Sequence, residues 1–126
     1  MSWNFRNFFF LTSCLFAITS FANPDSFSSQ LIKAAQERTH YSVTYDGSYV
    51  AMAYPMGDVP LDRGVCTDLV IRAYRSLGID LQQLVHEDMH NNFSHYPNIW
   101  GLSSTDTNID HRRVPNLQTF FKRYGE

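Results

Sequence analysis

Cysteine is scarce in this chain. Its 126 residues include two cysteines, Cys14 and Cys66, and Cys14 lies in an apolar N-terminal segment. If that segment is removed after export, Cys66 has no intramolecular partner, which excludes a scaffold held by internal disulfides. Cys66 is then a buried thiol, half of an intermolecular disulfide, or a nucleophile.

An excess of basic residues is also lacking. Ten lysines and arginines are outnumbered by twelve aspartates and glutamates, and the formal net charge is −2. This balance argues against the basic surface with which proteins bind nucleic acid. The length predicts one domain, and the aromatic content of 15% favours a packed core over disorder.

The sequence has no unbroken apolar run of about 20 residues, the length that a membrane-spanning helix needs. Its longest apolar stretch follows Arg6, and Ser20-Phe21-Ala22 then places small residues at the −3 and −1 positions. This layout predicts a cleavable signal peptide over residues 1–22 and one domain over residues 23–126. We therefore expect an exported protein, periplasmic or extracellular, without a membrane attachment after cleavage.

Two alternatives remain for the N-terminal segment. It forms an uncleaved helix, or Leu11–Cys14 acts as a lipoprotein signal with a lipid on Cys14. The lipoprotein reading is disfavoured because few residues precede Leu11 and the apolar run continues past Cys14.

The pattern of apolar and turn residues predicts an α+β fold. Strands over 41–45 and 48–54 flank Asp46-Gly47, a strong signal for a two-residue hairpin. Residues 91–113 have the composition of a long ordered loop. Capping residues and apolar spacing predict helices over 28–38, from 66 to about 77, from 81 to about 89, and from 115 to 124.

The helix expected from Cys66 carries an apolar stripe. Its members recur at helical spacing and are Leu69, Val70, Ala73, Tyr74 and Leu77. We expect this stripe to face inward and to pack against a sheet.

Cys66 follows Gly64-Val65 at the start of that helix. Free backbone N–H groups and the positive end of the helix dipole stabilise a thiolate at such a position. The same N–H groups can bind an oxyanion, so the local pattern is suited to a thiol hydrolase. The alternative is a small buried side chain with no chemical role.

His86, Glu87 and His90 match the pattern H-E-x-x-H. On a helix the two histidines share a face and can chelate zinc, with the glutamate as base. However, Asp88 places a charge inside the pattern, the helix is expected to fray after His90, and no third ligand is marked. We therefore favour a solvated helix end, expect no metal or other cofactor, and regard a zinc metallopeptidase as the weaker alternative.

Asp110 and His111 precede two arginines. An aspartate next to a histidine can orient a general base, so His111 is the candidate base within this chain and Asp110 its orienting partner. The adjacent arginines disfavour the protonated form of His111. The alternative is a loop held in place by local ion pairs.

Six segments carry a further signal, and they are Tyr45–Gly47, Tyr54–Pro60, Gly64–Arg75, Gly78–Gln82, Leu84–Met89 and Asn108–Gln118. In this order they closely resemble the domain-of-unknown-function family 1287 (DUF1287), and the resemblance extends over nearly all of residues 23–126. The family is similar to NlpC-like, papain-fold cell-wall hydrolases, in which a cysteine at a helix start faces a histidine on an antiparallel sheet. The resemblance maps the nucleophile onto Cys66 and implies thiol-dependent cleavage of amide bonds in peptidoglycan peptides.

The resemblance also predicts that this chain is truncated. Family members continue beyond position 126 with most of the sheet and with the expected base histidine. The chain then corresponds to the front half of a papain-like fold: an N-terminal helix, one β-hairpin, the cysteine helix and further helices.

Three hypotheses follow for the function. The chain is an enzyme that uses His111, or an inactive truncated product. Otherwise it is a non-enzymatic envelope module that binds a partner through the aromatic loop from Phe93 to Trp100. The sequence does not indicate an oligomeric state.

Overall fold

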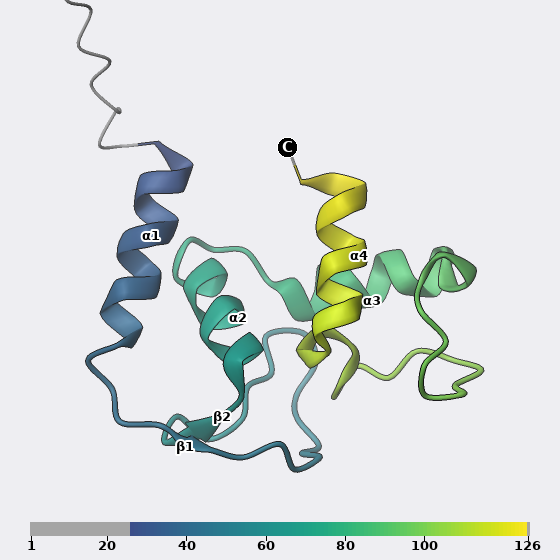
Figure 1. The fold of residues 1–126 in the computed structure, drawn as a ribbon, viewed down its shortest axis with the longest axis horizontal. Coiled ribbons are helices and arrows are strands. Elements are labelled where there is room, and N and C mark those ends of the chain that lie inside the picture. Colours follow the sequence, from purple (N-terminus) through teal and green to yellow (C-terminus); the bar gives the residue numbers. More distant parts are fainter. Residues whose placement is uncertain (1–25, 126) are drawn as a thin grey trace, which may run out of the picture.

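The computed structural model describes residues 26–125 and shows a mainly helical α+β architecture (Figure 1). The predicted signal peptide and Cys14 lie outside these residues. The elements, in chain order, are α1 (Phe27–Arg38), β1 (Thr44–Tyr45), β2 (Arg63–Gly64), α2 (Cys66–Ser76), α3 (Leu81–Asn91), the 3-10 helices η1 (Phe93–His95) and η2 (Asp110–Arg112), and α4 (Val114–Tyr124).

The predicted helices are confirmed. Ser26 caps α1, where its Oγ accepts a hydrogen bond from the N–H of Ser29 at 3.2 Å. Asp80 caps α3 by accepting from the N–H of Gln82 at 3.0 Å. These short polar side chains satisfy N–H groups that a helix leaves without an internal partner, which is why they mark helix starts in a sequence.

α2 contacts α1 as well as α3 and η2, so it joins the helices into one packed unit. α1 lies against α2, whereas α4 packs on α3 and η2, so that α1 and α4 stand on either side of α2 (Figure 1). Within residues 26–125, no helix combines the length and the apolar character that a bilayer crossing requires.

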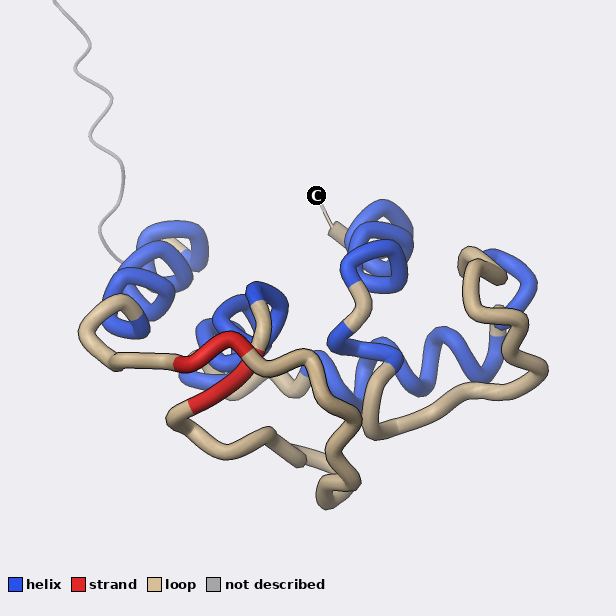
Figure 2. Tube along the Cα trace, turned by 60° about the horizontal axis from the view of Figure 1, so that its bottom comes forward, coloured by secondary structure: helices blue, strands red, loops and turns tan. Residues whose placement is uncertain are grey.

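The predicted β-hairpin is wrong. β1 pairs instead with β2 in parallel, with Thr44 opposite Arg63 and Tyr45 opposite Gly64. Figure 2 shows these two short strands side by side, with a long loop connecting them. The carboxylate of Asp46 accepts from the N–H of Ser48 at 2.9 Å, a local turn that does not lead into a second antiparallel strand.

Side chains take the place of a strand partner along the segment that was expected to form the second hairpin strand. The N–H of Met52 donates to Asn108 Oδ1 at 2.9 Å. Gln82, fully buried on α3, donates to the carbonyl of Ala53 at 3.0 Å and accepts from the N–H of Gly57 at 2.7 Å. Because these backbone groups are satisfied by side chains, the segment forms no ladder.

The apolar core lies where α2, α3 and α4 meet. Its buried members are Ile71, Leu81, Val85, Leu117 and Phe120. The apolar spacing of α3 predicts that Leu81, Leu84, Val85 and Met89 point inward. This prediction is confirmed for Leu81, Val85 and Met89 and is wrong for Leu84, which is 41% exposed.

The predicted inner face of α2 is confirmed in part. Ala73 is buried, and Val70 and Tyr74 pack partly buried against the core that α2 shares with α3 and α4 rather than against a sheet, whereas Leu69 is 39% exposed. Asp68 and Arg72 are buried as well, because each forms an ion pair. Arg72 meets Asp58 at 2.9 Å and donates to the Val59 carbonyl at 3.1 Å.

A second buried carboxylate joins α3 to α4. Asp88 accepts hydrogen bonds from Arg123 at 2.8 and 3.0 Å and from the hydroxyls of Tyr96 and Tyr124, each at 2.6 Å. Burial alone would raise the pKa of Asp88, but these donors outweigh it and hold the pKa at about 2. The charge that appeared out of place within H-E-x-x-H is therefore a structural anchor.

Candidate functional site

The thiol of Cys66 is exposed at the first residue of α2. The N–H of the preceding Val65 donates to Asp68 Oδ2 at 2.6 Å, which fixes the start of the helix. The N–H groups of Cys66 and Thr67 lie in the first turn, where an α-helix offers no internal acceptor. The structure thus combines an accessible thiol with backbone donors at one helix start.

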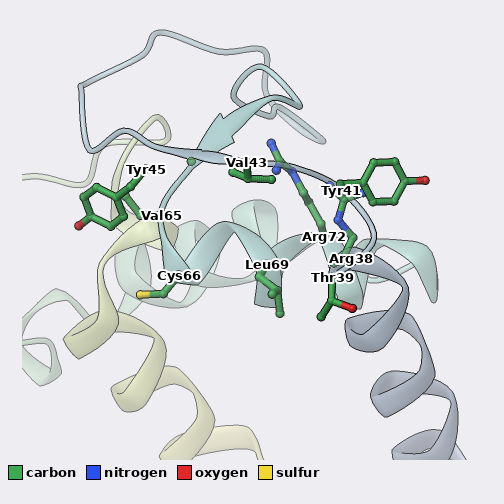
Figure 3. Close-up of a pocket in the computed structure, with 10 residues that line it drawn as sticks. Arg38, Thr39, Tyr41, Val43, Tyr45, Val65, Cys66, Leu69 and Arg72 are labelled. Atoms are coloured by element: carbon green, nitrogen blue, oxygen red, sulfur yellow. The ribbon is translucent and has the colours of Figure 1, made fainter.

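A groove of about 410 Å³ runs along α2 beside this thiol. We call it the Cys66 groove. Figure 3 shows Cys66, Val65 and Tyr45 at one end and Arg38, Thr39 and Tyr41 at the other, with Val43 and Leu69 between them. The walls come from the end of α1, from the strand segment that contains β1, and from α2, so the groove depends on the parallel β1–β2 pairing.

A buried ion pair holds the first turn of α2 against η2. Arg112 donates from Nε and Nη2 to the two carboxylate oxygens of Asp68 at 2.9 and 3.0 Å. The two side chains are 2% and 4% exposed. Thr67 adds a hydrogen bond from its hydroxyl to the Arg112 carbonyl at 2.8 Å. Sequence reasoning missed this contact, although both partners lie in motifs that it singled out.

His111, the base proposed from the sequence, is buried beneath α2 rather than in the groove. It is 2% exposed, its Nδ1 has no hydrogen-bond partner within residues 26–125, and it does not line the Cys66 groove. Burial lowers the pKa of His111 to about 4, and the carboxylate of Asp68 only partly counters this. The ring is therefore neutral near pH 7.

Asp110, the expected orienting residue, is occupied elsewhere. Its carboxylate pairs with Arg113 at 3.2 Å and accepts from the N–H of Asp106. Burial raises the pKa of this carboxyl group. These contacts match the alternative of a loop held in place by local ion pairs, and they do not orient the ring of His111.

His86 and His90 lie on one face of α3 with their ring centroids 6.1 Å apart. His86 also packs edge-on against Tyr54, and Glu87 accepts from Gln83 Nε2 at 2.8 Å. Across residues 26–125, no three His, Cys, Asp or Glu side chains are grouped as metal ligands would be.

Part of the aromatic loop from Phe93 to Trp100, the partner-binding segment of the third hypothesis, packs inside the fold. Tyr96 is buried and bonded to Asp88, and Trp100 stacks under Arg113, whose guanidinium carbon lies 4.0 Å from the ring centroid. Ile99 and Trp100 remain exposed, so the loop keeps only a small apolar surface.

Comparison with known sequences identifies the family. The profile of "Domain of unknown function (DUF1287)" matches residues 32–126, from within α1 to the end of the chain. The chain belongs to the DUF1287 family. A curated relative, "Uncharacterized protein YijF" of Escherichia coli strain K12, is 57% identical over 92 residues.

This alignment covers 73% of the DUF1287 chain and 45% of the relative. The chain therefore spans just under half the length of the curated relative that it matches. No solved structure matches the chain. The family membership covers Cys66, the groove and the Asp68–Arg112 ion pair, so these features lie inside the DUF1287 region.

Proposed function

We propose that the DUF1287 chain carries the nucleophile of an exported thiol hydrolase that cleaves amide bonds in peptidoglycan peptides. The observation that carries the proposal is the exposed thiol of Cys66 at the first residue of α2, bordering the Cys66 groove. The resemblance to NlpC-like, papain-fold hydrolases supplies the reaction class and the cell-wall substrate.

The proposed reaction proceeds through a thioester. The thiolate sulfur of Cys66 forms a bond to the carbonyl carbon, and the N–H groups of Cys66 and Thr67 donate to the developing oxyanion. Collapse of this intermediate breaks the C–N bond, and the departing amine takes up a proton. Water then cleaves the thioester, which releases the new carboxyl group and restores the thiol.

This reaction needs a base that faces the thiol. A base within hydrogen-bonding reach must remove the thiol proton and protonate the amine. His111 does not line the groove, and its low pKa prevents it from serving as the imidazolium partner of a thiolate near neutral pH. We therefore assign the base to the length of the family protein that this chain does not span, as the resemblance implies.

The test compares this chain with an extended chain, in which the unmatched residues of the E. coli relative are joined to it. Purified peptidoglycan is digested with each protein, and released peptides are measured by mass spectrometry. We expect activity in the extended chain, loss of that activity in its Cys66→Ser variant, and no activity in the 126-residue chain. Cleavage by the short chain that requires both Cys66 and His111 would restore His111 as base, and cleavage that survives Cys66→Ser would refute the proposal.

A further inference from the structure

Arg38, at the end of α1, is a cation without an anionic partner among the described residues. Its guanidinium carbon lies 4.3 Å from the ring centroid of Tyr41, and its buried Nη2 has no hydrogen-bond acceptor in this part of the chain. No ion pair within residues 26–125 includes Arg38. A partly desolvated charge is costly when it lacks a partner, so this side chain favours an incoming anion.

The other cation in the groove wall, Arg72, already has an anionic partner. Arg72 pairs with Asp58 at 2.9 Å, a carboxylate that it shares with Arg75, and it donates to the carbonyls of Val59 and Pro60 at 3.1 and 3.2 Å. Among the described residues that line the Cys66 groove, Arg38 is therefore the cation that lacks an anionic partner. A carboxylate suits it best, because guanidinium and carboxylate form charge-assisted hydrogen bonds in matching planar geometry.

The length of the groove sets the distance between this charge and the thiol. Arg38 lies at the Arg72 end in Figure 3, and Cys66 lies at the opposite end. Arg72 lies six positions after Cys66 on α2, which is about 9 Å along a helix that rises about 1.5 Å per residue. An extended peptide rises about 3.3 Å per residue, so roughly three peptide residues cover this distance.

We propose that the Cys66 groove selects an extended peptide with a carboxylate about three residues from the bond at the thiol, and that Arg38 binds this carboxylate. Val43 and Leu69, which lie between Cys66 and Arg38, form an apolar wall. This wall then contacts an uncharged side chain of the peptide, located between the cleaved bond and the carboxylate. The position of the cleaved bond rests on the proposed function, whereas the recognition of the carboxylate does not require turnover.

The experiment measures binding to the full chain with Cys66→Ser, so that no probe is consumed. The probes are fluorescently labelled acetyl-Ala-Leu-Ala-Glu amide, the same residues in reverse order, and the matching glutamine peptides. In the better of the two orders, we expect the glutamate peptide to bind about tenfold more tightly than its glutamine counterpart, as for a charge-assisted hydrogen bond. Arg38→Gln should abolish this preference.

Lys33→Gln is the matched control. Lys33 lies on the same helix and lines a neighbouring hollow but not the Cys66 groove, so this variant makes the same charge change without touching the groove. Arg38→Glu should transfer the preference to a lysine peptide, which separates recognition from a loss of folding. Thermal melts verify that each variant is folded.

Every outcome of this experiment either supports or overturns the proposed binding of a carboxylate by Arg38. A glutamate preference that is lost in Arg38→Gln and retained in Lys33→Gln supports it. Equal binding of the two peptides, a preference that survives Arg38→Gln, or no binding of any probe overturns it. If the extended chain cleaves no peptidoglycan while the Arg38-dependent preference is present, the proposed hydrolysis fails and the binding inference stands.

Discussion

Acidification should destabilise the folded chain through His111. The ring is 2% exposed, and burial lowers its pKa from 6.5 to about 4, with Arg112 and Arg75 adding to the effect and Asp68 and Asp80 opposing it. The unfolded chain therefore binds a proton at a higher pH than the folded chain does. The contribution of the neutral His111 ring to the free energy of unfolding is complete above pH 6.5 and is lost as the pH falls toward 4.

The expected magnitude is large for a domain of this size. Each unit of pKa corresponds to about 1.4 kcal/mol, so a fall from 6.5 to about 4 corresponds to about 3 kcal/mol. Net stabilities of ordinary domains are only about 5–15 kcal/mol. Asp110 works in the opposite direction: its raised pKa lets the folded form take up a proton first, which offsets part of the loss at the acidic end. The pKa of Asp88, held at about 2, lets its carboxylate stabilise the fold above pH 3.8, and this contribution is lost only as the pH falls below 3.8.

Urea unfolding between pH 7 and pH 4 measures this effect. We expect the free energy of unfolding to fall further in the parent chain than in His111→Gln, with a difference of about 3 kcal/mol between them at pH 4. Only the slope of the free energy of unfolding against pH is compared, so a lower overall stability of the variant does not affect the result. His111→Leu serves as a second variant with a neutral side chain. His40→Gln, at an exposed position, is the control and should keep the parent slope. Equal slopes in the parent and both His111 variants would refute the reasoning.

Three further predictions concern the ion pair, the core and export. Arg112→Leu leaves the buried carboxylate of Asp68 unpaired and should lower the free energy of unfolding in urea by about 3–5 kcal/mol. Arg63→Leu removes two more exposed ion pairs, with Asp46 and Asp62, and should cost under about 1 kcal/mol; equal losses would contradict the burial argument. Leu81→Ala should cost about 2–5 kcal/mol, and the half-exposed Leu84→Ala should cost clearly less in the same titration. N-terminal sequencing of protein recovered from the periplasm or medium should begin at Asn23, and an intact initiator methionine would argue against the signal peptide.

The sequence was most informative where structure depends on neighbouring residues. Ser26 and Asp80 mark the starts of α1 and α3, and the spacing of Leu81, Val85 and Met89 identifies the inner face of α3. These signals are local because a capping side chain bonds to a backbone group two or three residues away.

Contacts between segments that are far apart in the sequence could not be predicted from local signals. The turn signal at Asp46-Gly47 predicts a hairpin, but the pairing that forms joins β1 to residues near Arg63, and side chains from α3 satisfy the intervening backbone. Apolar periodicity likewise identified only part of the inner face of α2, because Asp68 and Arg72 are also buried there in ion pairs. A pattern that counts only apolar side chains does not detect such a face.

Only part of the candidate site could be predicted. The position of Cys66 at a helix start follows from the sequence, and the structure places the thiol there and leaves it exposed. The groove and the contribution of Arg38 could not be predicted, because they arise where the end of α1, the β1 segment and α2 come together.

The role of Cys66 as nucleophile is tested most directly by trapping the thioester. The extended chain is mixed with soluble peptidoglycan peptides, quenched in acid within seconds, digested, and analysed by peptide mass spectrometry. We predict an acyl adduct on the peptide that contains Cys66, released by hydroxylamine and absent in Cys66→Ser. Cleavage of wall peptides with no adduct at Cys66, and with full activity in Cys66→Ser, would contradict the account.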